Sequence, residues 1–281
     1  MTQVVTQLRL ALSWVALFLA TAACSCVPAA SARDPQAQDR VCALILEMEN
    51  RYRSARLYSD VGSVTVRMFE ESMSPIGSTR AIFETNFDRA SASFLFEYMT
   101  TVGDATQVAI WRQNGGPTRA WSSTNEHVRE EPTLASALQS FAGMSNGTSR
   151  LVPSILGGLG SEFRGLPLRF DGEELVADER CFRLSASGSH AVIIWISERD
   201  YTIRKLFDRV HLQATPEDIR FAKKLAPPGF SEEALRELAQ RRSSPFVVET
   251  TTEYLPVIDR PIRPSRFAFT VPRQDGTGLS K

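Results

Sequence analysis

Apolar residues recur at helical spacing near residue 40 and at every second position over most of the later chain. Between residues 38 and 55, one helical stripe is formed by Val41, Leu44, Ile45, Met48 and Tyr52. This spacing predicts an amphipathic helix that covers an apolar surface. From about residue 60 the period changes to two, which is the spacing of β-strands with one buried face.

Alternating segments follow one another through the first half of the chain and return after residue 166. Their connections are short, so we expect an antiparallel meander of about ten or eleven strands in total. The stretch Ala191–Ser197 is apolar at nearly every position, which predicts a central strand that is buried on both faces.

Two segments interrupt the strand pattern. Residues 132–156 are unusually apolar and place Leu134, Leu138 and Phe141 at helical spacing. Residues 216–242 begin with a proline and acidic residues and carry a charged amphipathic pattern, which predicts a helical insertion. The first segment is expected to act as a helical lid on the sheet.

The segment that starts near Arg266 is expected to be one more strand. Pro261 and Pro264 cannot donate to a β-ladder, so the preceding strand must end before them. After these prolines Phe267, Phe269 and Val271 alternate with polar and small residues. We expect them to complete an apolar lining.

The N-terminus has the pattern of a secretory signal. Arg9 precedes an apolar run, Leu10–Ala23, which is too short for a stable membrane span and leads into small residues. This pattern predicts a signal peptide, 1–32, that is cleaved after Ala32. A single domain, 33–281, then follows in the periplasm. The alternative is a lipid anchor through Cys24, which would give peripheral membrane association.

The cysteine count suggests a disulfide, and the net charge bears on the class of partner. Cleavage after Ala32 leaves Cys42 and Cys181, which are candidates for a disulfide in an oxidising compartment; two separate buried thiols are the alternative. The 32 basic and 32 acidic residues cancel, which argues against nucleic acid as the main partner.

No catalytic or metal-binding constellation is visible in the sequence. His127, His190 and His211 are scattered without metal-ligand spacing, and no serine lies in a nucleophile elbow. We therefore expect a protein that is not an enzyme, with no catalytic residues, no metal and no cofactor.

Aromatic residues gather on the expected inner side of neighbouring strands. They are Phe83, Phe87, Phe94, Phe96, Tyr98 and Trp111. One interpretation is an ordinary core beneath the helices. The other is a half-barrel larger than its side chains fill, in which the helical lid closes a cavity for an acyl chain. The residues alone favour neither.

Five stretches resemble, in order and spacing, proteins of the LolA/LolB-like superfamily, the periplasmic lipoprotein carriers and related lipoprotein-sorting proteins. They are YRSARLYSDVGSVTV, FETNFDRASASFLFEY, CFRLSA, IIWISERDYTIRKL and YLPVIDRPIRPSRFAFTVP. The resemblance implies a mainly β fold with some α: an unclosed antiparallel β-barrel with an N-terminal helix, a helical lid and a hydrophobic cavity. The essential arginine of the carriers is not assigned to any residue of this chain.

The expected function is non-enzymatic binding of lipid or lipoprotein acyl chains in the cell envelope. The expected cavity lining adds Leu138, Phe141, Trp195, Phe267 and Phe269 to the six aromatic residues above. The alternative is an envelope sensor or protein-interaction domain that docks a partner protein through residues 216–242. An exported hydrolase ranks last, because it needs a nucleophile and a base that the sequence does not present together.

Overall fold

The computed structural model describes residues 35–102, 106–125, 127–188, 190–212 and 245–272. The predicted signal peptide with Cys24 and the predicted helical insertion at 216–242 lie outside the described residues.

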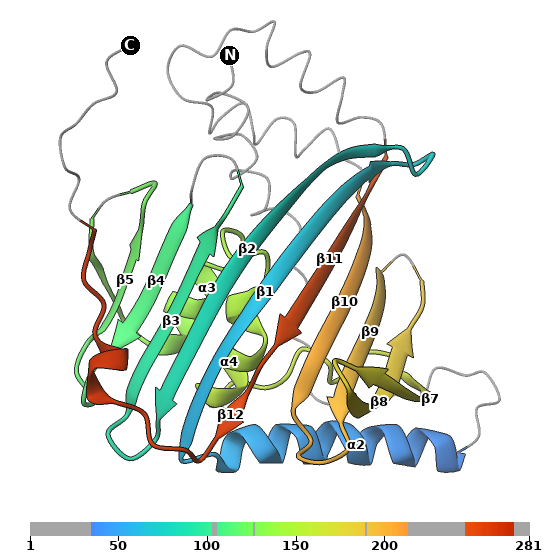
Figure 1. Cartoon of the computed structure of the whole chain (residues 1–281), viewed down its shortest axis with the longest axis horizontal. Helices are drawn as coiled ribbons and strands as arrows, with labels where there is room; N and C mark the ends of the chain where they lie inside the picture. Colours follow the sequence, from blue (N-terminus) through green and yellow to red (C-terminus); the bar gives the residue numbers. More distant parts are fainter. Residues whose placement is uncertain (1–34, 103–105, 126, 189, 213–244, 273–281) are drawn as a thin grey trace, which may run out of the picture.

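A single antiparallel sheet dominates the structure (Figure 1). Its order is β6-β5-β4-β3-β2-β1-β11-β10-β9-β8-β7, and the short β12 also pairs with β1. The strand bounds are β1 Leu57–Glu70, β2 Pro75–Asp88, β3 Ser93–Thr100, β4 Gln107–Arg112, β5 Thr118–Ser122, β6 Arg129–Glu131, β7 Arg169–Val176, β8 Glu179–Ala186, β9 His190–Ser197, β10 Ile203–Leu212, β11 Phe246–Tyr254 and β12 Val257–Ile258. The edge strands β6 and β7 are not paired with each other. The predicted fold class, mainly β with an unclosed antiparallel sheet and a few helices, is confirmed.

Two consecutive meanders meet in the middle of this sheet. Strands β1 to β6 follow one another in space, and so do β7 to β11. The pairing of β11 with β1 joins the two meanders, so that Val64 lies opposite Thr252. As a result, the first and last long strands are central rather than at the edges.

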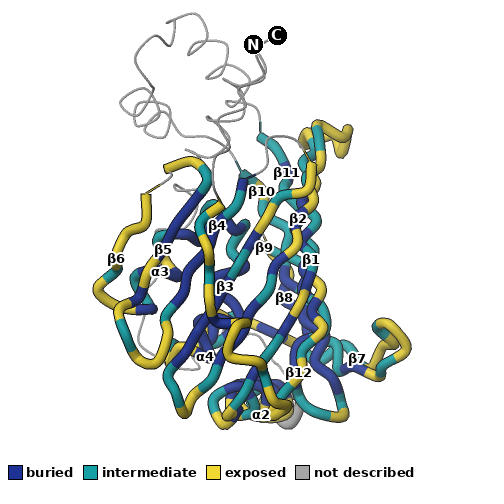
Figure 2. Tube along the Cα trace, turned by 60° about the vertical axis from the view of Figure 1, so that its left-hand side comes forward, coloured by how far each residue is buried: buried dark blue, intermediate teal, exposed yellow. Residues whose placement is uncertain are grey.

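Helices cover the inner face of the sheet. The helix α2, Pro35–Ser54, runs beneath one end of the strands and contacts β7 and α4 (Figure 1). The insert after β6 contains α3, Leu134–Ser140, the 3-10 turn η1, Thr148–Arg150, and α4, Val152–Leu156. Every residue of α4 is buried (Figure 2). The sequence therefore correctly predicted both the N-terminal helix and the apolar helical segment that covers the sheet.

The motif Tyr-x-Asp-x-Gly at the start of β1 is explained by its buried surroundings. The Tyr58 hydroxyl donates to the Asp60 carboxylate at 3.0 Å, and the backbone N–H of Leu255 donates to the other carboxylate oxygen at 2.8 Å. Asp60 is 1% exposed. A buried carboxyl group must be hydrogen-bonded, and these two donors meet that need. The motif thus joins β1 to the end of β11.

The C-terminal stretch differs from the prediction. Pro264–Phe267 forms a 3-10 turn, η2, and the residues after it are not a strand. Phe269 instead packs on the outer face of the sheet, with its ring centroid 5.0 Å from Trp111 and 5.5 Å from Trp121. The physical reason is that the outer side of β3–β5 carries a second apolar cluster that requires cover.

Replacing Phe269 by alanine should uncover Trp111 and Trp121. Phe269 is only half-buried, so we expect a loss of about 1–2 kcal/mol in the free energy of unfolding, less than for a fully buried phenylalanine. Urea denaturation measures the loss, and a red shift of tryptophan emission reports the exposure. Leu255→Ala is the control, because Leu255 is 69% exposed; equal effects of the two changes would contradict this packing.

The structure shows no disulfide between Cys42 and Cys181, so the predicted pairing is not confirmed. Cys181 alternates with Phe182 and Leu184 along β8, and these two belong to or pack on the inner cluster. Its side chain therefore points to the outer face, whereas Cys42 lies on the helix that covers the inner side. Burial raises the pKa of the Cys181 thiol to about 11, which makes it unreactive near neutral pH.

Candidate binding surfaces

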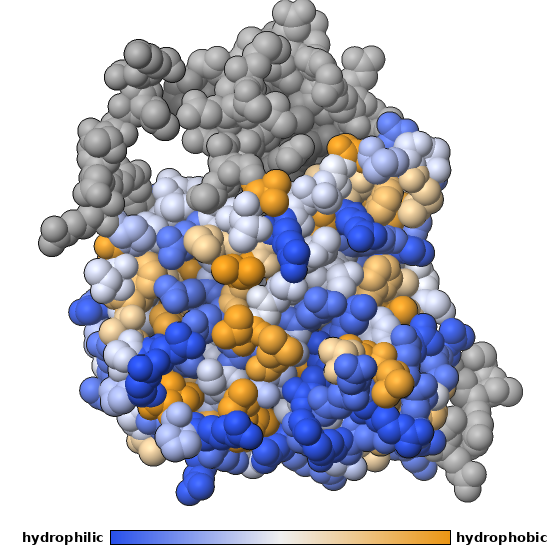
Figure 3. All heavy atoms as spheres, in the orientation of Figure 1, coloured by the Kyte–Doolittle hydropathy of each residue, from blue (hydrophilic) through white to orange (hydrophobic). Residues whose placement is uncertain are grey.

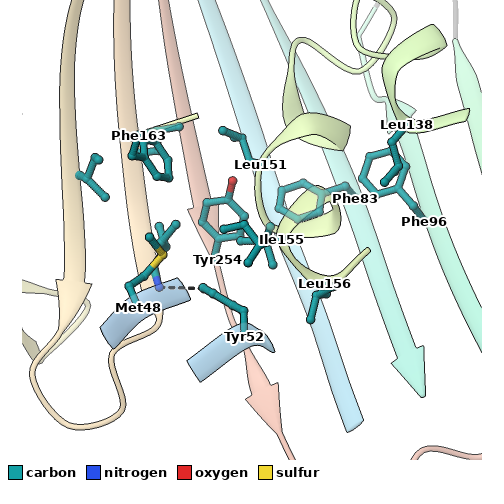
Figure 4. Packing of buried hydrophobic residues seen from close by; sticks show 14 of the residues in the cluster. Met48, Tyr52, Phe83, Phe96, Leu138, Leu151, Ile155, Leu156, Phe163 and Tyr254 are labelled. Carbon is teal, nitrogen blue, oxygen red and sulfur yellow. Dashed lines mark hydrogen bonds between the residues drawn. The ribbon is translucent and has the colours of Figure 1, made fainter. Parts of the chain in front are cut away.

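Seven of the residues predicted to bind a ligand meet on the inner face. They belong to one core cluster and are Phe83, Phe87, Phe94, Phe96, Tyr98, Leu138 and Phe141. Figure 4 shows Phe83 and Phe96 of the sheet facing Ile155, Leu156 and Leu138 of the helical insert. The strand register brings them together, because Phe83 pairs with Tyr98, Thr85 with Phe96 and Phe87 with Phe94.

The centre of the inner face is packed solid in the described residues. Phe94, Phe96, Tyr98 and Leu138 have no accessible surface at all, and Ile155 has 1%. No water-sized space therefore lies beside the first four side chains, as in an ordinary close-packed core. An acyl chain would have to displace the helical insert before it reached them. A ligand-binding role for these seven residues stays a prediction.

The other four predicted lining residues are not on this face. Trp111, Trp195, Phe267 and Phe269 lie outside the inner cluster. On β4 the register pairs Ile110 with Phe96, so Trp111 must point to the outer side. Trp195 follows the same rule on β9, where its neighbours Ile194 and Ile196 are the inner residues. Phe267 is buried within η2, which contacts β2 and β3.

One polar contact connects the insert to the aromatic sheet surface. The Asn146 side-chain amide donates to the Tyr98 hydroxyl. Burial raises the pKa of Tyr98 to about 12, so the phenol stays protonated at every physiological pH. Elsewhere the insert faces the sheet mainly with apolar residues of α3 and α4.

Asp60 is the buried carboxyl group that most resembles a tuned catalytic acid. Burial raises its pKa from 3.8 to about 6, against the hydrogen bonds from Leu255 and Tyr58 that lower it. A raised carboxyl pKa in a cleft indicates a functional acid. Here the group is enclosed by its hydrogen-bond donors and has almost no exposed surface, so a substrate cannot reach it.

Asp60 gives the folded state a measurable pH dependence. Because its pKa is higher in the folded state than in the unfolded state, its contribution favours folding below about pH 4 and is lost as the pH rises through about 6. The full loss is about 3 kcal/mol. The variant Asp60→Asn should therefore gain stability relative to the unmodified chain between pH 4 and pH 6 in urea titrations. Parallel curves for the two proteins would contradict the shifted pKa.

A groove of about 470 Å³ lies on the outer face. Strands β7 to β11 and the loop after β8 supply its lining, which is Arg169, Arg183, Ser185, Ala186, Ser187, Ala191, Ile193, Trp195, Lys205, Phe207, Arg209 and Thr251. Figure 3 shows hydrophilic side chains gathered on this half of the outer face, over β9–β11. The volume is in the range of ordinary ligand sites.

Four of the lining residues are cationic, and none is acidic or a histidine. Acidic groups stand around the groove: Asp171 contacts Arg169 and Arg183 at 2.9 Å each, and Glu249 contacts Arg209 at 2.5 Å. Two aromatic rings face cations, with Lys205 Nζ 5.3 Å from the centroid of Trp195 and the Arg209 guanidinium 5.6 Å from that of Phe207. Sequence reasoning missed this groove. It assigned Trp195 to the inner face, and the basic residues look like ordinary surface charges until the register aligns them.

One histidine on β9 has an ion-pair partner on the neighbouring strand. His190 Nε2 lies 2.7 Å from the Asp208 carboxylate of β10. Within the described ranges, no group of three or more histidine, cysteine, aspartate and glutamate side chains is arranged to hold a metal ion. In the same part of the chain, no helix is both long and apolar enough to cross a bilayer.

Comparison with known proteins leaves the family open. No family model matches the chain, and no curated protein matches it. Among solved structures, a DUF1329 family protein from Desulfovibrio piger has a TM-score of 0.32 and 8% identity, covering 82% of this chain and 96% of that one. MucB, solved in complex with MucA(peri), has a TM-score of 0.31 and 9% identity, covering 59% of this chain and 48% of that one. Likenesses at this level carry no conclusion about this chain, and membership of the LolA/LolB-like superfamily stays a prediction.

Proposed function

We propose that this chain is a non-enzymatic binding protein of the cell envelope that docks a protein partner on the outer face of its sheet. The observation that carries the proposal is the contrast between the two faces. The centre of the inner face is occupied by α3 and α4 with no water-sized space beside Phe94 or Phe96, whereas the outer face presents an open groove of about 470 Å³. A partner therefore meets the groove without any rearrangement of the core.

Two further points support this function. The secretory pattern ahead of Ala32 supports a location of the mature chain outside the cytoplasm. The most strongly perturbed carboxyl group, Asp60, serves the fold and is closed to substrates. Both points support binding rather than chemistry as the role of this surface.

Site-specific photo-crosslinking tests the proposal. A benzophenone amino acid replaces Ser187, which is exposed in the groove, or Ile82, which is 43% exposed on β2 of the same outer face. In cells that export the chain, we expect a defined protein adduct from position 187 that disappears when Lys205→Glu is added. No adduct at position 187, or adducts at both positions that ignore Lys205→Glu, would overturn the proposal.

Acyl-chain binding is the second candidate, and one observation favours it. The helical insert contacts the sheet largely through apolar residues, together with the hydrogen bond between Asn146 and Tyr98. A hydrocarbon chain that displaced the insert would restore equivalent contacts.

Uptake of a fluorescent fatty acid decides this second candidate. The variant Tyr98→Phe loses its hydrogen bond to Asn146, which weakens the attachment of the insert by about 1 kcal/mol. If the insert opens for an acyl chain, uptake should rise several-fold in Tyr98→Phe. Absence of saturable uptake in both proteins would eliminate an acyl ligand, and equal uptake would show that the insert does not move.

A further inference from the structure

Three of the four cations of the outer groove lie in two rows that cross β9. Because antiparallel register places residues side by side, Arg183 of β8, Trp195 of β9 and Lys205 of β10 form one row across the sheet. A second row begins with Ala191 of β9 and continues to Arg209 of β10. The two rows are four residues apart on β9, which is roughly 13 Å. Positive charge therefore lies at both ends of the groove.

Between these rows the floor is apolar. Ile193 lies opposite Phe207 on one side and Ser185 on the other. The small side chain of Ser185 lies opposite Arg169 of β7. The groove thus combines an apolar strip with cationic side chains at both of its ends.

Lys205 is the cation that the fold has left without an acidic partner. Among the described residues no carboxylate lies within ion-pair distance of its ammonium group, which sits over the ring of Trp195. Glu253 is directly opposite Lys205 in the sheet, but its carboxylate accepts a hydrogen bond from Ser63 at 3.3 Å. A ligand carboxylate can therefore pair with Lys205 without breaking an existing ion pair.

The positions of the acidic groups disfavour a flat anionic surface, such as a membrane, as the ligand of this groove. Asp171, Glu174 and Glu249 pair with the arginines from outside the lining. These carboxylates would repel a charged membrane that lay across the whole face, whereas a narrow chain can pass between them. A single phosphate would reach only one end of the groove.

From these observations, and resting on the proposed function, we infer that the outer groove binds an acidic, extended peptide segment of the partner protein. Two or more carboxylates of this segment, about 13 Å apart at most, pair with the cations of the two rows. An apolar side chain between them packs on Ile193 and Trp195. Charge complementarity gives the segment its orientation, and the apolar contact excludes water from the ion pairs.

Fluorescence anisotropy with a labelled peptide tests the inference on the full mature chain. The probe is a ten-residue peptide of glutamates with one central phenylalanine, and its match has glutamine in place of every glutamate. We expect saturable binding of the glutamate peptide only, weakening as salt is raised. Lys205→Glu should weaken binding by about tenfold or more. Arg67→Glu makes an equal charge change at an exposed position of β1 and should leave binding within about twofold.

Two further competitors distinguish an acidic peptide from other anionic ligands. Inorganic phosphate and phosphatidylglycerol vesicles are offered to the same proteins, and neither should compete with the peptide at a physiological concentration. Lys205→Met, which keeps the apolar stem and removes the charge, serves as a second variant if Lys205→Glu unfolds. Equal affinity of Lys205→Met and Arg67→Glu, binding of the glutamine peptide, or vesicle binding without peptide binding would each overturn the inference.

The two experiments together distinguish failure of the acidic segment from failure of the docking surface. A position-187 protein adduct that depends on Lys205, in a chain that ignores the acidic peptide, leaves the outer face as a docking surface but overturns the acidic segment. Absence of a position-187 adduct in the chain that retains Lys205 overturns the proposed function itself, whatever the peptide does.

Discussion

Replacing Gly62 by alanine is expected to destabilise the fold by about 3 kcal/mol or more. A Cβ atom at this position would lie 2.1 Å from the ring of Phe83 and 2.4 Å from the backbone oxygen of Glu253. The ring can move, but the carbonyl belongs to β11, which pairs with β1 in the middle of the sheet. Insertion of one methyl group must therefore push apart the two strands that join the meanders.

Gly77→Ala is the matched control for this prediction. It lies in β2 of the same sheet, and an added Cβ would meet only the end of the Met68 side chain at 3.6 Å, an ordinary contact. We expect the control to change the free energy of unfolding by less than about 0.5 kcal/mol. Urea unfolding of both variants measures the difference, and a similar small loss for Gly62→Ala would mean that β1 and β11 are less tightly joined than the structure indicates.

The second large effect is expected from Arg164→Ala. The Arg164 guanidinium binds the Glu49 carboxylate through two nitrogens, one of them Nε at 2.7 Å. The Glu49 side chain is completely buried in α2, and its other basic partner is Arg53 at 3.0 Å. Loss of one partner from a buried ion pair costs about 3–5 kcal/mol; because Arg53 remains, we expect the lower end, about 3 kcal/mol.

Two comparisons make this second prediction decisive. Arg119→Ala removes an exposed ion pair with Glu130 and should cost less than about 1 kcal/mol. The double variant Glu49→Met, Arg164→Met replaces the buried pair by apolar groups and should recover most of the loss. If Arg164→Ala is as mild as Arg119→Ala, the ion pair does not hold α2 to the loop between α4 and β7.

Local sequence patterns predicted most of the helices and strands of this fold. Stripes of apolar residues located α2 and the insert, and alternation located most strands, because each depends on neighbours within a few residues. The motif Tyr58-x-Asp60-x-Gly62 lies at the start of β1. Only the tertiary structure explains these residue types, because Asp60 accepts a hydrogen bond from Leu255 and Gly62 lies against the backbone of Glu253.

The candidate site was predicted less well, for a physical reason. Alternation divides a strand into two sets of side chains but does not say which set faces the helices. Trp111 and Trp195 were assigned to the inner face, yet the pairing of Ile110 with Phe96 and the burial of Ile194 place both on the outer one. Apolar character alone misled the assignment, because this sheet has apolar clusters on both faces.

The sequence by itself determined most of the secondary structure and the mainly β class. Only the tertiary structure decided which strands are neighbours, that α3 and α4 fill the inner face, and that Lys205 lies beside Arg183 and Arg209 across the outer one. The reason is that local patterns come from backbone geometry, whereas strand partners are chosen by contacts between residues far apart in the chain. Lys205 and Glu253 face each other across β10 and β11 although 47 other residues separate them in the sequence.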